Sequence, residues 1–176
     1  AVMKSNSDGL IIDGVVSYID RDNIDTDQII PTEYLKSIKK FGYEDYLFDG
    51  WRYLDDGKLG IKKEDRDINK DFILNNEPYN ESKILLTRDN FGCGSSREHA
   101  VWALRDFGIK AVIASSFGDI FYNNCFKNGV LPIKLEKDDI EKLFNLVKIE
   151  VVEISIDLHQ RSIFLNDKIQ ISFKVD

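Results

Sequence analysis

Short runs of apolar residues along this chain predict the strands of a β-sheet. Continuous aliphatic runs at 84–86 and 111–114 are typical of strands buried on both faces. The segment 11–19 predicts a further strand, bent at its glycine. Alternating apolar and polar residues predict a strand at 151–158 and a hairpin over 163–175, which turns at Asn166 and Asp167.

Between these strands, apolar residues recur with the spacing of an α-helix. The pattern predicts helices over 100–107, ended by Gly108, and over 117–127. An apolar stripe at 140–147 predicts a helix that buries one face in the core. The segment 31–38 begins with a proline, which is well placed to open a short helix.

The order of these elements predicts the fold class. A strand, a helix and a strand follow one another within 84–114, which implies a parallel pair with a right-handed crossover. Because the last hairpin is antiparallel, we expect an α/β fold with a mixed sheet and flanking helices. We expect one domain over residues 1–176. The charged segment 55–71 is expected to be a solvated loop, and residues 1–9 to be disordered or foreign to the natural protein.

Charge and composition limit the partners and cofactors that we expect. The chain has 24 basic and 31 acidic residues, a net charge of −7, and no basic cluster, which argues against nucleic-acid binding. No apolar run has membrane-spanning length, and no export signal is present, so we expect no membrane contact and a cytoplasmic location. Two cysteines and two histidines at these spacings predict no disulfide framework, metal site or cofactor on this chain.

Candidate chemistry is concentrated in residues 90–99, between a predicted strand and a predicted helix. Gly92 and Gly94 permit a tight turn and let a ligand approach the main chain. Ser95 begins the Ser-x-x-Glu pattern of a capping box, which by itself is more often structural than functional. Arg97 adds a cation at the helix N-terminus, so a structural cap and an anion site are about equally supported.

Other polar residues have plainer expected roles. We expect Cys93 to be a small buried residue, and His99 to pack or hydrogen-bond rather than act as a base. Asp25, Thr26 and Asp27 suit a turn or a helix cap and do not fit an EF-hand pattern.

At these motifs the chain resembles a known family. The segment 94–99, Gly-Ser-Ser-Arg-Glu-His, resembles the signature of the swivelling β/β/α domain of the aconitase superfamily. Other signatures of that domain are matched at 23–31, 117–124 and 128–132. The segment 47–55 resembles the bacterial family of 3-isopropylmalate dehydratase small subunits, and the likeness extends from about residue 12 to residue 175.

The resemblance implies a hydro-lyase of leucine biosynthesis, which interconverts 2- and 3-isopropylmalate by dehydration and rehydration. It implies that Ser95 is the catalytic base, acting as an alkoxide, and that Arg97 is catalytic and holds a substrate carboxylate. Asp27 matches an acidic position that orients a histidine of a separate large subunit. Further residues implied to contact the dicarboxylate substrate are Gly94, Ser96, Thr26 and Leu35.

The same resemblance implies a partner and a cofactor. A large subunit is expected to carry a [4Fe–4S] cluster and to form a heterodimer or heterotetramer with this chain, which is inactive alone. Aconitases place an arginine downstream of the aspartate that Asp27 matches, where this sequence has Lys39 and Lys40. This departure argues against a tricarboxylate, and we expect Leu35 to pack against an isopropyl group instead.

Two alternative functions stay open. One is the small subunit of a hydro-lyase for a related malate derivative, such as citramalate or dimethylmalate. The other is a non-catalytic module that binds an anion at the same helix N-terminus.

Overall fold

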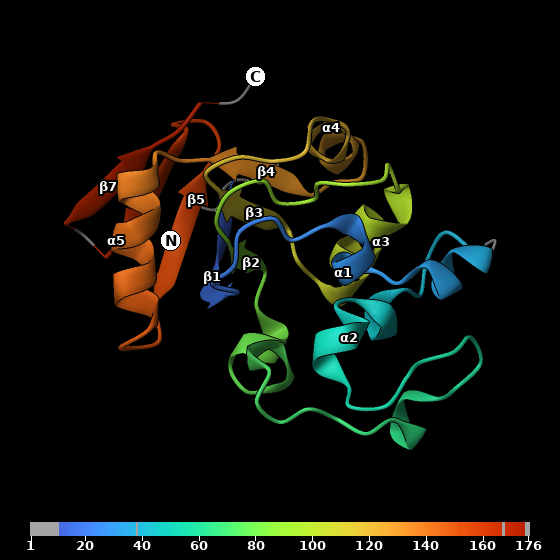
Figure 1. The fold of residues 1–176 in the computed structure, drawn as a ribbon. Helices are drawn as coiled ribbons and strands as arrows, with labels where there is room; N and C mark the ends of the chain where they lie inside the picture. The colour runs from blue at the N-terminus through green and yellow to red at the C-terminus, as the bar shows by residue number, and fades with distance from the viewer. Residues whose placement is uncertain (1–10, 38, 167, 175–176) are drawn as a thin grey trace.

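The computed structural model describes residues 11–37, 39–166 and 168–174, so the expectation for residues 1–9 lies outside the described residues. Within them, the chain forms a seven-stranded sheet in the order β4-β3-β2-β1-β5-β6-β7 (Figure 1). The strands are β1 (Ile11–Tyr18), β2 (Ile84–Leu86), β3 (Ala111–Ala114), β4 (Leu131–Lys134), β5 (Glu153–Asp157), β6 (Ser162–Leu165) and β7 (Ile169–Ser172).

The sheet has a parallel half and an antiparallel half, which share β1. Strands β1, β2, β3 and β4 run parallel, with Ser17 opposite Leu85 and Leu85 opposite Val112. Strand β5 pairs antiparallel with β1, and β6 and β7 extend that half. The predicted α/β fold with a mixed sheet is confirmed, and so is the parallel pair around residues 84–114.

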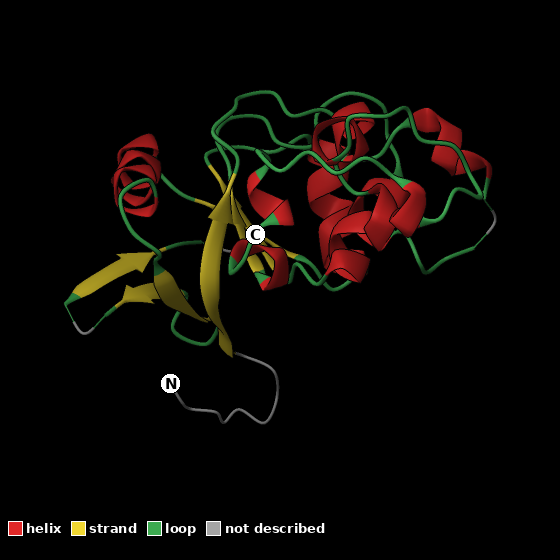
Figure 2. Cartoon of the chain, turned by 90° about the horizontal axis from the view of Figure 1, so that it is seen from below, coloured by secondary structure: helices red, strands yellow, loops and turns green. Residues whose placement is uncertain are grey.

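Helices cover both faces of the sheet. They are α3 (Glu98–Phe107), α4 (Asp119–Lys127) and α5 (Lys137–Val147), close to the predicted bounds. Figure 2 shows α5 on one side of the sheet and the other helices on the opposite side. Helix α3 ends as predicted at Gly108, whose φ is +112°. The longest helix among the described residues, α5, has 11 residues. No helix of the described residues is long and apolar enough to cross a membrane.

Burial on both faces explains the unbroken aliphatic runs of β2 and β3. Leu85 faces the core beneath α3 and α4, whereas Ile84 and Leu86 face the core beneath α5. The predicted apolar stripe of α5 fills this second core, and its four residues are 2% exposed or less: Ile140, Leu143, Phe144 and Val147.

The sequence pattern did not predict β4. Pro132 lies in its middle, and proline counts against a strand because it cannot donate a hydrogen bond to a neighbouring strand. In the structure β4 is the edge strand beside β3. Its other side makes one isolated bridge, from Lys134 to Lys174, and pairs with no strand of the described residues, so the proline is tolerated.

The long connection from β1 to β2 contains only short helices among its described residues. They are α1 (Thr26–Ile29), η2 (Thr32–Lys36), η3 (Glu44–Tyr46), α2 (Asp49–Arg52), η4 (Lys63–Asp65), η5 (Ile73–Asn75) and η6 (Tyr79–Glu81). The short helix expected over 31–38 is η2, which Pro31 precedes.

The charged segment 55–71, from here on the charged loop, is mostly irregular and contains the short helix η4. The expectation that it is solvated throughout is wrong at Arg66, whose side chain is only 4% exposed. Burial is possible because its guanidinium pairs with Asp49 at 2.7 Å and with Asp55 at 2.7 Å.

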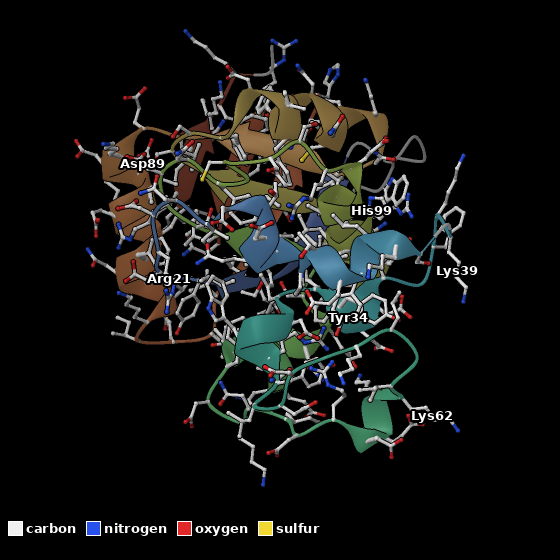
Figure 3. The ribbon with its side chains drawn as sticks, turned by 45° about the vertical axis from the view of Figure 1, so that its right-hand side comes forward. Arg21, Tyr34, Lys39, Lys62, Asp89 and His99 are labelled. Carbon is white, nitrogen blue, oxygen red and sulfur yellow. The ribbon has the colours of Figure 1, made fainter. Side chains whose placement is uncertain are left out.

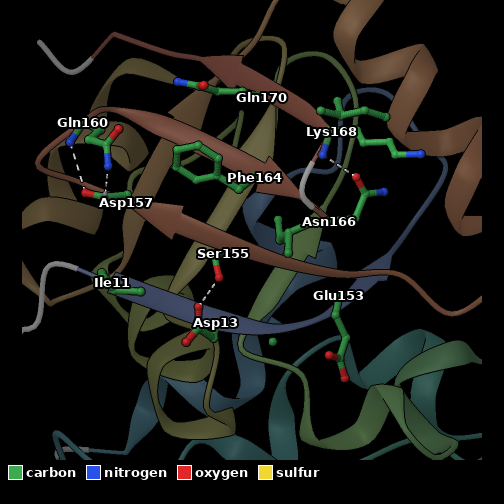
Figure 4. Close-up of a pocket in the computed structure, with 13 residues that line it drawn as sticks. Ile11, Asp13, Glu153, Ser155, Asp157, Gln160, Phe164, Asn166, Lys168 and Gln170 are labelled. Carbon is green, nitrogen blue, oxygen red and sulfur yellow. Dashed lines mark hydrogen bonds between the residues drawn. The ribbon is translucent and has the colours of Figure 1, made fainter. Parts of the chain in front are cut away.

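A broad hollow of about 880 Å³ lies on the antiparallel half of the sheet, on the face opposite α5 (Figure 4). Ser155 donates a hydrogen bond to Asp13 in its lining. Glu153 and Asp157 also line it, with Lys168 as the one lysine. Because acidic groups dominate, this hollow does not suit the anionic ligand that the sequence predicts.

Candidate active site

The glycine-rich turn, residues 90–97, leaves the carboxyl end of β2 and leads into α3. It therefore lies at the edge of the sheet where open α/β folds bind ligands. Gly92 and Gly94 have φ values of +78° and +94°, in the left-handed region that favours glycine. Helix α3 begins at Glu98, with Arg97 at its N-cap position and no side-chain hydrogen bond capping it. The Ala100 N–H donates to the carbonyl oxygen of Arg97 at 3.2 Å, whereas the N–H groups of Glu98 and His99 have no acceptor among the described residues and are left for another one.

The capping box predicted at Ser95 is wrong. The carbonyl oxygen of Ser95 accepts a hydrogen bond from the Thr26 hydroxyl at 2.8 Å, which holds the Ser95 peptide against α1 and outside α3. The Glu98 carboxylate, which should have closed the box, accepts instead from the side-chain amide of Asn128 at 2.9 Å.

A capping box does form nearby, on α1. The carboxylate of Asp25 accepts from the Gln28 N–H at 2.8 Å, and the Gln28 side chain accepts from the Asp25 N–H at 2.9 Å. The cap role predicted for Asp25 is thus confirmed. The Thr26 N–H donates to the carbonyl oxygen of Cys93 at 2.9 Å, so α1 is docked on the glycine-rich turn. This contact places Asp27 beside the turn as well.

Arg97 and Asp27 form an ion pair across these two segments. The Arg97 side chain is 13% exposed and that of Asp27 is 62% exposed, so the guanidinium is partly sheltered while the carboxylate reaches solvent. The structure therefore brings together two residues that the sequence predicted for the site. A carboxylate this exposed can exchange its partner at little cost.

A cavity of about 290 Å³, here called the site hollow, opens between the turn and the start of α4. The residues that line it are Thr26, 92–97 and 118–121. Ser95 and Ser96 are both exposed, so their hydroxyls are accessible to a ligand. An arginine, two hydroxyls and the N-termini of α3 and α4 together suit a carboxylate.

Asp27 is absent from the lining of the site hollow, and so are two other residues considered from the sequence, Leu35 and His99. Leu35 is half-buried on η2, against the core that includes Tyr34, and is absent from the lining. His99 packs with its ring 4.6 Å from that of Trp102 and 5.5 Å from that of Tyr43, so the packing role predicted for it is confirmed. Burial lowers the pKa of His99. Figure 3 shows His99 on α3 and Tyr34 below it.

Cys93 differs from its expected role. It is partly exposed and lines the site hollow, because the turn opens there. Burial of its sulfur and the nearby charge of Asp25 raise the pKa of the thiol, which keeps it protonated near neutral pH.

Reasoning from residue types alone missed the contribution of α4. Asp119, Ile120 and Phe121 line the site hollow, and Ile120 is 56% exposed. The sequence did hold a signal for α4, because the segment 117–124 resembles a family signature. No functional role was expected for any residue of that segment.

Gly118 sets the spacing between the two loops of the site. A Cβ atom at Gly118 would lie 2.6 Å from the carbonyl oxygen of Gly92 and 3.1 Å from Cα of Cys93. We expect Gly118→Ala to lower the free energy of unfolding by about 1–3 kcal/mol, because the clash is with backbone that cannot turn aside. Urea unfolding measures this loss.

Gly50→Ala is the matched control, since nothing lies within 4 Å of a Cβ atom there. It should change the unfolding free energy by no more than about 0.5 kcal/mol. Equal stabilities of the two variants would show that the two loops are not closely packed at Gly118.

Comparison with known proteins identifies the family of this chain and similar solved structures. Residues 9–138 match the family described as the aconitase C-terminal domain. In a solved structure, 3-isopropylmalate dehydratase LeuD from Methanocaldococcus jannaschii is similar with a TM-score of 0.63 and 32% identity, over 93% of this chain and 81% of that one.

Curated relatives are closer in sequence. The 3-isopropylmalate dehydratase small subunit of Hahella chejuensis is 52% identical over 94% of this chain and 77% of its own length. That of Magnetococcus marinus is 51% identical over 94% of this chain and 78% of its own length. That of Ruthia magnifica is 55% identical over 85% of this chain and 72% of its own length. The chain therefore belongs to the aconitase superfamily and, within it, to the family of 3-isopropylmalate dehydratase small subunits.

Proposed function

We propose that this chain is the small-subunit half of a 3-isopropylmalate dehydratase, and that it acts on the isopropylmalates of leucine biosynthesis by dehydration and rehydration. The observation that carries the proposal is the docking of α1 on the glycine-rich turn, which places Asp27 in an ion pair with Arg97 while Ser95 and Arg97 line one open hollow. The names of the relatives supply the substrate class.

In this proposal Ser95 takes the proton from the carbon next to a substrate carboxylate. A serine hydroxyl is too weak an acid to be ionised without help, so its alkoxide needs nearby positive charge. Arg97 and the uncapped first turn of α3 provide it at the site hollow. The proton stays on the Ser95 oxygen while the double bond forms, and it returns to carbon or is lost to solvent on rehydration.

Arg97 is proposed to hold a carboxylate of the substrate in a two-point contact that lysine cannot form. In the free chain this guanidinium is paired with the carboxylate of Asp27. On assembly, Asp27 would turn to a histidine of the large subunit, leaving Arg97 to the substrate. Gly94 and Ser96 are the further proposed contacts through their positions in the lining. Thr26 already uses its hydroxyl to hold the turn, which makes any contact with substrate secondary.

The cofactor is proposed to belong to the partner. Among the described residues, no group of three or more His, Cys, Asp or Glu side chains is arranged to hold a metal ion. The [4Fe–4S] cluster that the family resemblance implies is therefore assigned to the large subunit, where it would act as a Lewis acid on the departing hydroxyl. We propose a heterodimer or heterotetramer that works in the cytoplasm, and we expect this chain to be inactive alone.

Leu35 is the proposed contact for the isopropyl group. Burying such a group is worth about 1.5–3 kcal/mol, so we expect Leu35→Arg to lower kcat/KM for 2-isopropylmalate by about 10- to 100-fold. A γ-carboxylated analogue should lose less, because the new cation can pair with its extra carboxylate.

Kinetics of the reconstituted enzyme on both substrates test this assignment, with Leu35→Met as the control that keeps the side chain apolar. Unchanged discrimination in Leu35→Arg would show that Leu35 does not contact the substituent.

Anaerobic reconstitution with a cluster-bearing large subunit tests the function as a whole. Formation of the unsaturated acid from 2-isopropylmalate, followed by its absorbance, should require both chains. A stable complex that is inactive on 2-isopropylmalate but active on citramalate or dimethylmalate would favour the related hydro-lyase. Failure to bind any large subunit would favour a non-catalytic anion-binding module.

A further inference from the structure

A buried group of polar side chains lies beneath the segment that carries Leu35. The hydroxyl of Tyr34 donates to a carboxylate oxygen of Asp49 at 3.0 Å. The guanidinium of Arg66 donates to both carboxylate oxygens of Asp49, at 2.7 and 3.2 Å, and also contacts the Tyr34 hydroxyl at 3.4 Å. Tyr34 is 0% exposed, Asp49 5% and Arg66 9%. We call these three residues the buried triad.

The charged loop is closely fitted around the buried triad. Asp55 accepts from Nε of Arg66 at 2.7 Å, and the ring of Tyr53 lies 3.9 Å from the guanidinium carbon. Gly57 leaves room for the triad, because a Cβ atom there would lie 1.8 Å from the Tyr34 hydroxyl and 2.9 Å from Arg66. A largely exposed loop thus carries one charged side chain into the interior, which is favourable only when that charge is paired.

The buried triad is joined through η2 to Leu35, the proposed contact for the isopropyl group. Tyr34 and Leu35 are neighbours in this five-residue 3-10 helix, so the direction of one side chain sets the direction of the other. The Tyr34 ring also stacks on that of Tyr46 at 3.9 Å. The N–H of Phe48 donates to the carbonyl oxygen of Ile29 at 2.7 Å, which ties the end of α1 to the start of α2. Figure 3 shows Tyr34 between the helix that carries His99 and the loop that carries Lys62.

We infer that Asp49 and Arg66 are positioning residues for substrate selection: they hold the Tyr34 hydroxyl and thereby fix the direction in which η2 presents Leu35. The inference rests on the proposed function, in which Leu35 contacts the substituent of the substrate. It assigns the choice between substituents to Asp49 and Arg66, which do not touch the substrate themselves. Packing alone would hold the Tyr34 ring. The hydroxyl contact adds control over the rotation of η2, since it binds one point of the ring to a fixed carboxylate.

The test uses the reconstituted complex and two substrates that differ only in the substituent, 2-isopropylmalate and citramalate. Tyr34→Phe removes one hydroxyl and leaves the Asp49–Arg66 pair in place. We expect it to lower the preference for 2-isopropylmalate, as a ratio of kcat/KM values, by at least about threefold. The kcat on citramalate should stay within about twofold of the wild-type value, because a methyl group does not depend on Leu35.

Tyr53→Phe is the matched control. The Tyr53 hydroxyl is buried in the same neighbourhood and has no hydrogen-bond partner among the described residues, so its removal breaks no tether. Arg66→Lys keeps the charge and loses the two-point contact, and it should shift the preference in the same direction as Tyr34→Phe. In a Leu35→Ala background, Tyr34→Phe should shift the preference no further, because the triad acts through Leu35.

The possible outcomes separate the two proposals. If the wild-type complex prefers 2-isopropylmalate and Tyr34→Phe behaves like Tyr53→Phe, the inference is overturned and the proposed function stands. Equal losses on both substrates would likewise overturn it, since they indicate a general effect on folding or assembly. Inactivity of the wild-type complex on both substrates would overturn the proposed function and, with it, the inference.

Discussion

Replacing Ser95 by alanine is expected to lower kcat of the reconstituted enzyme by about 10²- to 10⁴-fold, which is the usual contribution of a positioned base. The variant should fold and assemble normally, because the side chain of Ser95 is exposed and its structural contact uses the carbonyl oxygen, which alanine keeps. Steady-state kinetics give the loss of turnover, and size-exclusion chromatography with the large subunit checks assembly.

Ser96→Ala provides the matched control for this experiment. Ser96 is also exposed and lines the same hollow, so the two variants differ in which hydroxyl is lost rather than in burial. We expect a loss of about tenfold or less from Ser96→Ala, as for a single hydrogen bond to substrate. Near-normal activity of Ser95→Ala, or a larger loss from Ser96→Ala, would remove Ser95 as the base.

Replacing Arg66 by methionine is expected to lower the free energy of unfolding by about 3–5 kcal/mol. Methionine fills much of the space of the arginine stem but leaves the Asp49 carboxylate, 7% exposed at its side chain, without its cation. A buried, unpaired carboxylate must either be desolvated as a charge or be protonated, and both cost free energy. Urea unfolding of the isolated chain measures the loss.

Two variants make this second test specific. Arg88→Met removes an arginine that pairs with Asp20 and Glu141 nearer the surface, where its side chain is 21% exposed, and it should cost about 0–1 kcal/mol. The double variant Asp49→Leu with Arg66→Met removes both charges and should recover much of the lost stability. If Arg66→Met is no worse than Arg88→Met, the Asp49–Arg66 pair is not buried as the structure has it.

Local patterns in the sequence predict most of the regular elements because those elements repeat with a fixed period. The strands around Leu85 and Val112, the helix that ends at Gly108 and the stripe through Phe144 all follow from spacing that any short window displays. Strand β4 escapes this reasoning because Pro132 is tolerated only at a sheet edge, and an edge is a property of the whole sheet.

The candidate site likewise has features that the local sequence determines and features that depend on tertiary contacts. The sequence by itself determined the glycine-rich turn at the carboxyl end of a strand and the residue types available there, because glycine, serine and arginine have intrinsic conformations and charges. Only the tertiary structure decided that the Ser95 carbonyl oxygen is held by Thr26 so that Ser95 does not cap α3, that Arg97 pairs with Asp27, and that Arg66 is buried against Asp49. Each of these contacts joins residues from different segments of the chain. A short stretch of sequence carries no information about such neighbours, because they meet only when the sheet and its loops have packed.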